Sequence, residues 1–195
     1  MWALVEDNAI TKIINNPKAM VIGDTQYSRN IFSFRWSNEE REAIGLYEVV
    51  FDNTNKKDQE YYTNTNQSFA YADGAVTASF GSATAKALAD VTENAIVIPG
   101  LKSQKKENIK QQASSLLTPS DWQVVKATEV ESYSVPSAIT TYRAAVRTSS
   151  NDMEVLIDAC STVDELATLF LYVNTADEGD PKVMERPLGE FPEAV

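Results

Sequence analysis

The chain has 195 residues, of which 43% are hydrophobic and 23% charged, and this composition is typical of a soluble globular protein with one domain or two small ones. Its formal net charge is −11. The basic cluster Lys102, Lys105, Lys106 and Lys110 fits the solvated face of a helix, so we predict no nucleic-acid partner. No apolar run is long enough to cross a membrane, and we expect no membrane association. The first residues lack the basic and apolar regions of a signal peptide.

The residue types that carry much enzymatic chemistry are missing from this sequence. There is no histidine, which excludes Ser-His-Asp and Cys-His catalysis and histidine-based metal sites. The single cysteine, Cys160, allows neither an intrachain disulfide nor a cysteine-rich zinc site, and no glycine-rich phosphate loop is present. We therefore predict a protein that is not an enzyme and that has no cofactor and no metal. A glycosidase-type carboxylate pair stays open at this point, because the separation of two carboxylates is not visible in a sequence.

The first hundred residues are predicted to form a small, mostly antiparallel β unit. Asp7-Asn8 and Asp73-Gly74 stand between apolar runs and tolerate the left-handed backbone of a tight turn, so we expect hairpins over 1–14 and 67–80. Ser37 and Glu40 have the spacing of a capping box, and Gly45 suits the end of the short helix that they begin. Further strands are expected over 20–22, 31–36, 46–51, 60–62 and, at an edge, 96–98.

From Leu101 onward the period of the hydrophobic residues becomes helical. The spacing of Ile109, Ala113 and Leu116 places them on one face of a first helix, which Pro119 ends. Further short helices are predicted at about 137–147, 151–160 and 162–173, the last with a capping box at Thr162. Helices of this length depend on packing against one another more than on their own propensity.

These patterns predict an α+β fold, in which a small antiparallel β unit precedes a unit of short helices and an extended tail. The expected boundaries are a mostly β domain over 1–90, a linker over 91–100, a helical domain over 101–173 and a tail over 174–195. The tail is acidic and contains prolines, but it also keeps Val183, Met184, Leu188 and Phe191, which a disordered tail usually lacks. We predict an arm that lies across a neighbouring subunit, with simple disorder as the alternative.

One stretch of the sequence resembles a known family. It reads Leu-Leu, then Ser-Asp-Trp, a spacer, Pro, and finally Tyr-Arg with a second Arg. The residues that carry it are Leu116, Leu117, Ser120, Asp121, Trp122, Pro136, Tyr142, Arg143 and Arg147. This pattern resembles the C-terminal part of bacteriophage tail-fibre assembly proteins, which accompany tail-fibre folding and sometimes stay on the fibre. A looser likeness is carried by Trp36, Glu39, Ile44–Tyr47 and Val76–Thr77.

The resemblance implies a non-enzymatic structural protein of the tail or tail fibre, assembled in the host cytoplasm and retained in the virion. The alternatives are a tail-fibre assembly chaperone that is not retained, and a capsid decoration protein. We expect docking on other tail or fibre proteins through aromatic and apolar anchors. The predicted interaction residues are Trp2, Trp36, Trp122, Tyr142, Arg143, Val183, Met184, Leu188 and Phe191. Core packing is the alternative for each tryptophan, and a helix-surface ion pair for Arg143. Homo-oligomers, with trimers favoured, are implied by the resemblance alone.

Overall fold

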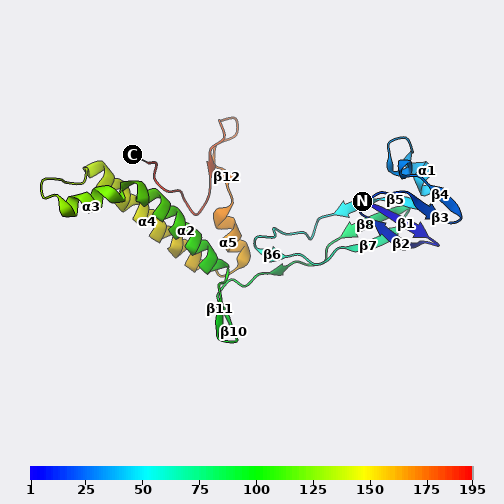
Figure 1. Cartoon of the computed structure of the whole chain (residues 1–195), viewed down its shortest axis with the longest axis horizontal. Helices are drawn as coiled ribbons and strands as arrows, with labels where there is room; N and C mark the ends of the chain where they lie inside the picture. Colours follow the sequence, from blue (N-terminus) through cyan, green and yellow to red (C-terminus); the bar gives the residue numbers. More distant parts are fainter. Residues whose placement is uncertain (195) are drawn as a thin grey trace. The chain divides into compact units, whose positions relative to one another are not determined.

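The structure, a computed structural model, describes residues 1–194 and divides into two compact units (Figure 1). Unit 1 comprises Met1–Thr84, and unit 2 begins at Ala85. Unit 1 is built of strands with one short α-helix, and unit 2 mainly of helices, so the predicted α+β fold is confirmed. The predicted linker over 91–100 contains a β-hairpin.

Unit 1 is organised around a five-stranded sheet with the strand order β2-β1-β5-β8-β7. Its strands are β1 (Trp2–Glu6), β2 (Ala9–Ile14), β5 (Leu46–Asp52), β7 (Ser68–Ala72) and β8 (Ala75–Ser79). Three of the neighbouring pairs are antiparallel, as predicted, but β5 and β8 run parallel. Both predicted hairpins are confirmed, and Asp7, Asn8 and Asp73 take the positive φ that their turns require.

Apolar side chains cover both faces of this sheet. One face carries a buried cluster around Ala3, Val49 and Val76. The edge strands β2 and β7 contact one another, so the sheet curls around this cluster. Successive side chains of a strand point to opposite faces, and Leu46 on the other face joins a second cluster with Ile14 and Ile31.

Residues 20–45 cover that second face. They form the hairpin of β3 (Met20–Ile22) and β4 (Thr25–Tyr27), the 3₁₀ helix η1 (Arg29–Phe32) and the helix α1 (Asn38–Glu42). The strand predicted over 31–36 is therefore wrong, because Ser28 caps a 3₁₀ turn that directs Ile31 into the core. The capping box of Ser37 and Glu40 is confirmed. Gly45 has φ 76°, and a Cβ there would collide with the Val5 carbonyl oxygen.

Unit 2 is built around the helices α2 (Leu101–Leu117) and α4 (Ser137–Ala159), which lie side by side (Figure 1). Its other helices are η2 (Thr118–Ser120), α3 (Asp121–Glu129) and α5 (Val163–Phe170). The separate helix predicted over 151–160 is wrong, because α4 continues through it and buries Met153 and Ile157 on the stripe of Tyr142 and Val146. The sequence analysis did not predict α3.

Short strands complete the described structure. They are β6 (Tyr62–Thr63), β9 (Thr84–Ala85), β10 (Val91–Glu93), β11 (Ile96–Ile98), β12 (Val173–Asn174) and β13 (Met184–Glu185). In unit 2 the pairs β10–β11 and β12–β13 form two separate hairpins. The capping box of α5 at Thr162 is confirmed, whereas Val173 lies in β12 rather than in the helix. Among residues 1–194, no helix combines the length and the apolar character needed to cross a membrane.

Candidate interaction surface

The motif that carries the resemblance folds into a corner at the end of α2, and Arg143 holds this corner together. The Arg143 side chain donates from Nη1 to the Leu117 carbonyl at 2.8 Å and to Ser120 Oγ at 2.6 Å, and its Nη2 pairs with Asp121 at 2.7 Å. Arg143 is only 8% exposed. One guanidinium on α4 therefore ties down α2, η2 and α3 at the same time, and such charge-assisted bonds are the strong ones.

This arrangement corrects two expectations about Arg143. It is neither a free interaction residue nor an ion pair on the surface of a helix. The reason is the 3₁₀ turn at Pro119, which leaves the Leu117 carbonyl without a continuing helix and turns it toward α4. Arg147, one turn further along α4, remains exposed, and the bond recorded for it runs from Nη1 to the Arg143 carbonyl at 3.4 Å.

The motif also contributes a side chain to the hydrophobic core of unit 2. Tyr142 is buried in a cluster with Ala113 and Val146, and the tail residue Phe191 packs against the same cluster. Leu188 is 3% exposed, and its N–H donates to the Leu169 carbonyl at 3.0 Å. The structure thus places Leu188 and Phe191 on the chain's own helices instead of on a neighbouring subunit. Tyr142 Oη has no hydrogen-bond partner within residues 1–194.

The lysines of the basic cluster on α2 contact α4 and α5, although Lys110 stays largely exposed. Lys106 pairs with Asp158 at 2.8 Å, and this hydrogen bond raises the pKa of the lysine. Lys110 pairs with Glu154 at 3.2 Å. Lys105, expected on a solvated face, is buried, with Nζ 4.3 Å from the centre of the Phe170 ring. These contacts hold α2 to its neighbours, which is a role in the fold.

Trp122 is the large apolar residue of the motif that the fold leaves exposed. Its side chain is 58% exposed, and no residue of α3 is buried. The alternative that Trp122 is a core residue is therefore wrong, because Asp121, fixed by Arg143, orients α3 so that Gln123 and Ala127 take the partly covered positions. The exposed apolar side chains on α3 and directly after it form what we call the α3 surface: Trp122, Val124, Val125 and Val130.

Trp2 and Trp36, by contrast, pack in the core of unit 1. Both belong to the second cluster, where Trp2 meets Phe32 edge-on at 5.7 Å between ring centres and Trp36 meets Tyr27 at 6.0 Å. The guanidinium of Arg41 stacks 4.8 Å from the centre of the Trp2 ring. These two tryptophans therefore stabilise the unit that contains them.

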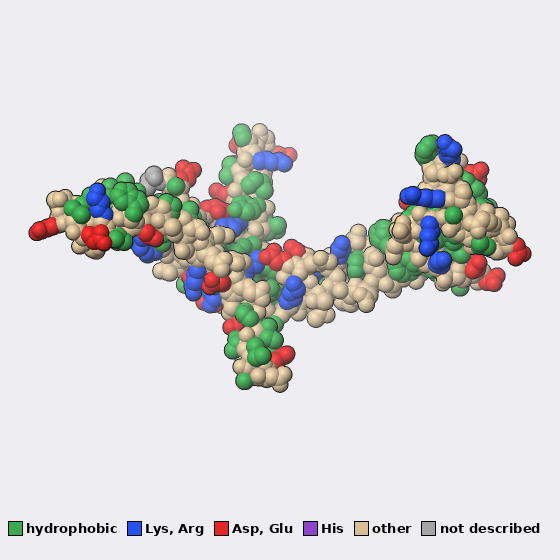
Figure 2. Space-filling view, in the orientation of Figure 1, with side chains coloured by type: hydrophobic (Ala, Val, Ile, Leu, Met, Phe, Trp, Pro, Cys, Tyr) green, Lys and Arg blue, Asp and Glu red, His purple; other side chains and the backbone are tan. Residues whose placement is uncertain are grey.

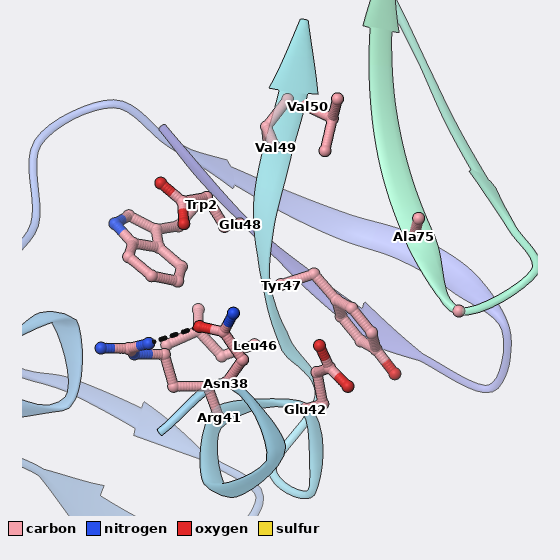
Figure 3. A pocket seen from close by; sticks show the side chains of 11 residues that line it. Trp2, Asn38, Arg41, Glu42, Leu46, Tyr47, Glu48, Val49, Val50 and Ala75 are labelled. Atoms are coloured by element: carbon pink, nitrogen blue, oxygen red, sulfur yellow. Dashed lines mark hydrogen bonds between the residues drawn. The ribbon is translucent and has the colours of Figure 1, made fainter. Parts of the chain in front are cut away.

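A pocket of about 280 Å³ opens beside Trp2 and the beginning of β5 (Figure 3). Its arginine, Arg41, is buried and donates to the carbonyls of Ile31 at 2.8 Å and Ser33 at 2.6 Å and to Asn38 Oδ1 at 2.9 Å. The guanidinium is thus committed to the fold. The sequence analysis did not single out Arg41, since an arginine among the acids of a short helix looks like a surface residue.

Apart from Val155 and Leu156 on α4, the remaining large exposed apolar side chains of unit 2 gather on its two hairpins, where Figure 2 shows hydrophobic side chains at the surface. They are Val91, Ile96, Val97 and Ile98 on and around β10–β11, and Leu171, Tyr172, Val173, Val183 and Met184 on and around β12–β13. Val183 and Met184, both predicted as interaction residues, are thus available at the surface. The hairpin β10–β11 gave no interaction signal in the sequence analysis.

Comparisons with family models, with curated proteins and with solved structures found no match for this chain. The resemblance to tail-fibre assembly proteins therefore stays a prediction. Within residues 1–194, no three potential metal-binding side chains come together. The exposed apolar side chains of unit 2 are therefore the candidate interaction surface of this chain.

Proposed function

We propose that this chain is a non-enzymatic structural protein of the tail or tail fibre of a tailed bacteriophage, and that it acts by docking on other tail or fibre proteins. The observation that carries the proposal is the exposure of Trp122 on a helix without buried residues. The sequence pattern that resembles the phage family supplies the class of partner, and the α3 surface supplies the means of binding.

The rest of the motif positions Trp122 for docking. Leu117, Ser120, Asp121 and Arg143 build the corner, and Tyr142 fills the cluster beneath it. This corner fixes the start of α3 and so fixes the direction in which Trp122 projects. A rigidly presented tryptophan among smaller apolar side chains is the usual centre of a protein–protein interface, because it buries a large area without a large loss of side-chain entropy.

The environment of Trp122 suits a partner protein. Lys126 lies 6.0 Å from its ring centre and 4.4 Å from that of the half-buried Tyr133, so one cation contacts two aromatic rings. Val125 extends the apolar area next to the tryptophan, one helical turn along. Apolar centres with charged or polar rims are typical of interfaces between separately folded proteins.

A tail-fibre assembly chaperone is the second candidate, and the same exposed side chains favour it. A chaperone binds its client reversibly and leaves, so an apolar surface that is open in the free chain fits this role as well. The two candidates differ in whether the chain stays in the finished particle.

Quantitative mass spectrometry of purified particles tests the proposal. Particles of a phage that encodes this chain are compared for its abundance against the major capsid protein. The proposal expects a low and fixed copy number. Absence from particles, together with recovery of the chain bound to fibre protein in the lysate, would favour the chaperone. A copy number close to that of the capsid protein would overturn both and favour a decoration protein.

A further inference from the structure

The hairpin β10–β11 projects from the beginning of α2 and leaves all of its strand residues exposed (Figure 1). Its turn is formed by Asn94 and Ala95 with φ 49° and 64°, the geometry of a two-residue turn that matches strand twist. The exposed fractions are 67% for Ile96 and 58% for Val97. An isolated two-stranded hairpin is at best marginally stable in water, so a hairpin this apolar gains from being covered.

No segment among the described residues provides that cover. None of the hairpin's residues belongs to a core cluster of residues 1–194. The hairpin β3–β4 of unit 1 is the useful contrast, because Met20, Ile22 and Tyr27 turn inward to the second cluster. The strand residues of β12–β13 are exposed as well, so full exposure distinguishes the two hairpins of unit 2 from the hairpin β3–β4 of unit 1.

The amount of exposed surface is large enough for an oligomer. The chain exposes 12900 Å², whereas two compact monomeric domains with the lengths of the two units would together expose about 11,000 Å². A standard interface takes about 800 Å² from each partner. The chain as a whole thus exposes more surface than two compact units need, and the exposed hairpin is one of the segments that contribute to this excess.

The free edge of β11 is complementary to itself. Glu93 and Ile96 flank the two-residue turn, and in such a hairpin this pair exchanges the hydrogen bonds. The next pair, Thr92 and Val97, then turns its backbone groups outward. If a second β11 pairs antiparallel with Val97 opposite Val97, both outward N–H and C=O groups of this residue are satisfied, and each Ile96 meets an Ile98.

The charges around this edge also permit a second copy. The chain carries a net charge of −11, which opposes self-association in general. The edge strand Ile96–Ile98, however, has no charged residue, and Glu93 belongs to the other strand. Asp90, at the base of the hairpin, accepts a hydrogen bond from the Gly100 N–H at 2.8 Å. Pro99 cannot donate a backbone hydrogen bond, so it limits the pairing to this short edge.

We propose that a second copy of this chain docks on the hairpin β10–β11 through antiparallel pairing of the two β11 strands. The pairing joins the two hairpins into one four-stranded sheet across a two-fold axis. It places the apolar side chains of both hairpins next to one another on the faces of that sheet, where Val97 lies beside Val97 and each Ile96 beside an Ile98. The inference deepens the proposed function in that both assign the chain to an assembly, but it concerns the isolated protein and a different surface.

Light scattering after size-exclusion chromatography of the full chain tests this inference. The wild type is expected to be a dimer, or a multiple of one. Val97→Lys places a charge on the paired edge and removes two valines from each two-fold interface, so the dissociation constant is expected to rise about a hundredfold. Val21→Lys is the matched control, since Val21 is the central residue of the three-residue strand β3 and is 57% exposed.

Cross-linking tests the register of the pairing. Opposed residues that exchange hydrogen bonds lie about 5.5 Å apart at Cα, within reach of a disulfide. Val97→Cys is therefore expected to give a covalent dimer under mild oxidation, and Val21→Cys to stay monomeric on a non-reducing gel. The native Cys160 is buried and does not compete.

A monomeric wild type, a trimer, or an oligomer that Val97→Lys leaves intact would each overturn the inference. None of these results bears on whether the chain is found in phage particles, so the failure of this inference and the failure of the proposed function can be told apart.

Discussion

Unit 1 and unit 2 differ in where they place their apolar side chains. In unit 1 they cover both faces of the sheet, and even the small hairpin β3–β4 contributes to a buried cluster. Its exposed apolar residues, such as Phe34, are scattered. Unit 2 has a buried core as well, but most of its exposed apolar side chains gather on the α3 surface and the two hairpins, with Val155 and Leu156 on α4 as the exceptions. Single exposed apolar residues are ordinary, but gathered ones mark interaction sites, so unit 2 is the part of the chain expected to bind partners.

The two units use their buried arginines in the same way, although they place their exposed apolar side chains differently. Arg41 in unit 1 and Arg143 in unit 2 each donate to main-chain carbonyls that have left regular structure. Around Arg41 this bonding supports a closed core beside Trp2. Around Arg143 it supports a corner whose tryptophan points outward. The same kind of arginine–carbonyl bonding therefore supports a closed core in unit 1 and an exposed tryptophan in unit 2.

The largest expected effect comes from removing the Arg143 side chain. Arg143→Met removes the hydrogen bonds of the guanidinium to the Leu117 carbonyl and the Ser120 hydroxyl and its ion pair with Asp121, and leaves the carbonyl with the Ser120 hydroxyl as its donor. We expect the free energy of unfolding of unit 2 to fall by about 3 kcal/mol. Arg147→Met, one turn away on α4, is the control and should change it by less than about 0.5 kcal/mol. Urea denaturation followed by circular dichroism measures both. Equal losses for the two variants would show that the corner is not held by Arg143.

The tryptophans provide the most direct contrast between the units. Trp2→Ala removes a ring from the second cluster, so the stability of unit 1 should fall by about 3 kcal/mol. Trp122→Ala removes an exposed ring and should leave the stability of unit 2 within about 0.5 kcal/mol. Thermal denaturation measures these losses.

The effect of Trp122→Ala should appear in particle assembly instead of in stability. Trp122→Ala, although stable, should lower the amount of the chain in purified particles. If instead Trp122→Ala unfolds unit 2, or is incorporated like the wild type, then the exposed tryptophan is not an interaction residue.

The smallest expected effect concerns the pKa of a tyrosine in unit 1. The hydroxyl groups of Tyr47 and Tyr71 share a hydrogen bond at 3.0 Å, and this bond, with burial, raises the pKa of Tyr47 to about 12. The folded state holds the proton more tightly than the unfolded chain, whose tyrosines titrate at about 10. The contribution to stability is therefore present below about pH 10 and lost as the pH rises through about 12.

Spectrophotometric titration of tyrosinate in the wild type and in Tyr71→Phe measures this effect. The variant is expected to lose the tyrosine that titrates last, because the main cause of the raised pKa is gone. Tyr133→Phe, in unit 2, removes a tyrosine elsewhere and should leave that last titration in place. A last titration that is unchanged in Tyr71→Phe would contradict the assignment of the raised pKa to the pair.

The parts of this structure that sequence could predict are those set by near neighbours in the chain. The turn at Asp7-Asn8 and the capping boxes at Ser37 and Thr162 depend on side chains within three or four residues, and all three are confirmed. The first half of the buried stripe of α4, with Tyr142 and Val146, is similar, because it follows from helical spacing. Sequence patterns therefore predict those parts of the structure that interactions between near neighbours determine.

The parts that sequence could not predict depend on partners far along the chain. Arg143 is buried because a carbonyl 26 residues earlier leaves its helix at that point. The parallel pairing of β5 with β8 is set by how the whole sheet closes. Exposure of Trp122 follows from the same corner, so a motif that reads as one pattern in sequence divides into a buried part and an exposed part.

Hydroxyl-radical footprinting of the chain, free and in purified particles, tests the central claim most directly. The account predicts that oxidation of Trp122, Ile96 and Val97 falls sharply in the assembled protein, because partners cover these side chains. Phe34 of unit 1, 94% exposed in the chain by itself, should be oxidised to a similar extent in both. If the side chains of unit 2 stay as reactive in particles as in the free chain, then the exposed apolar surface of unit 2 does not bind partners and the account is wrong.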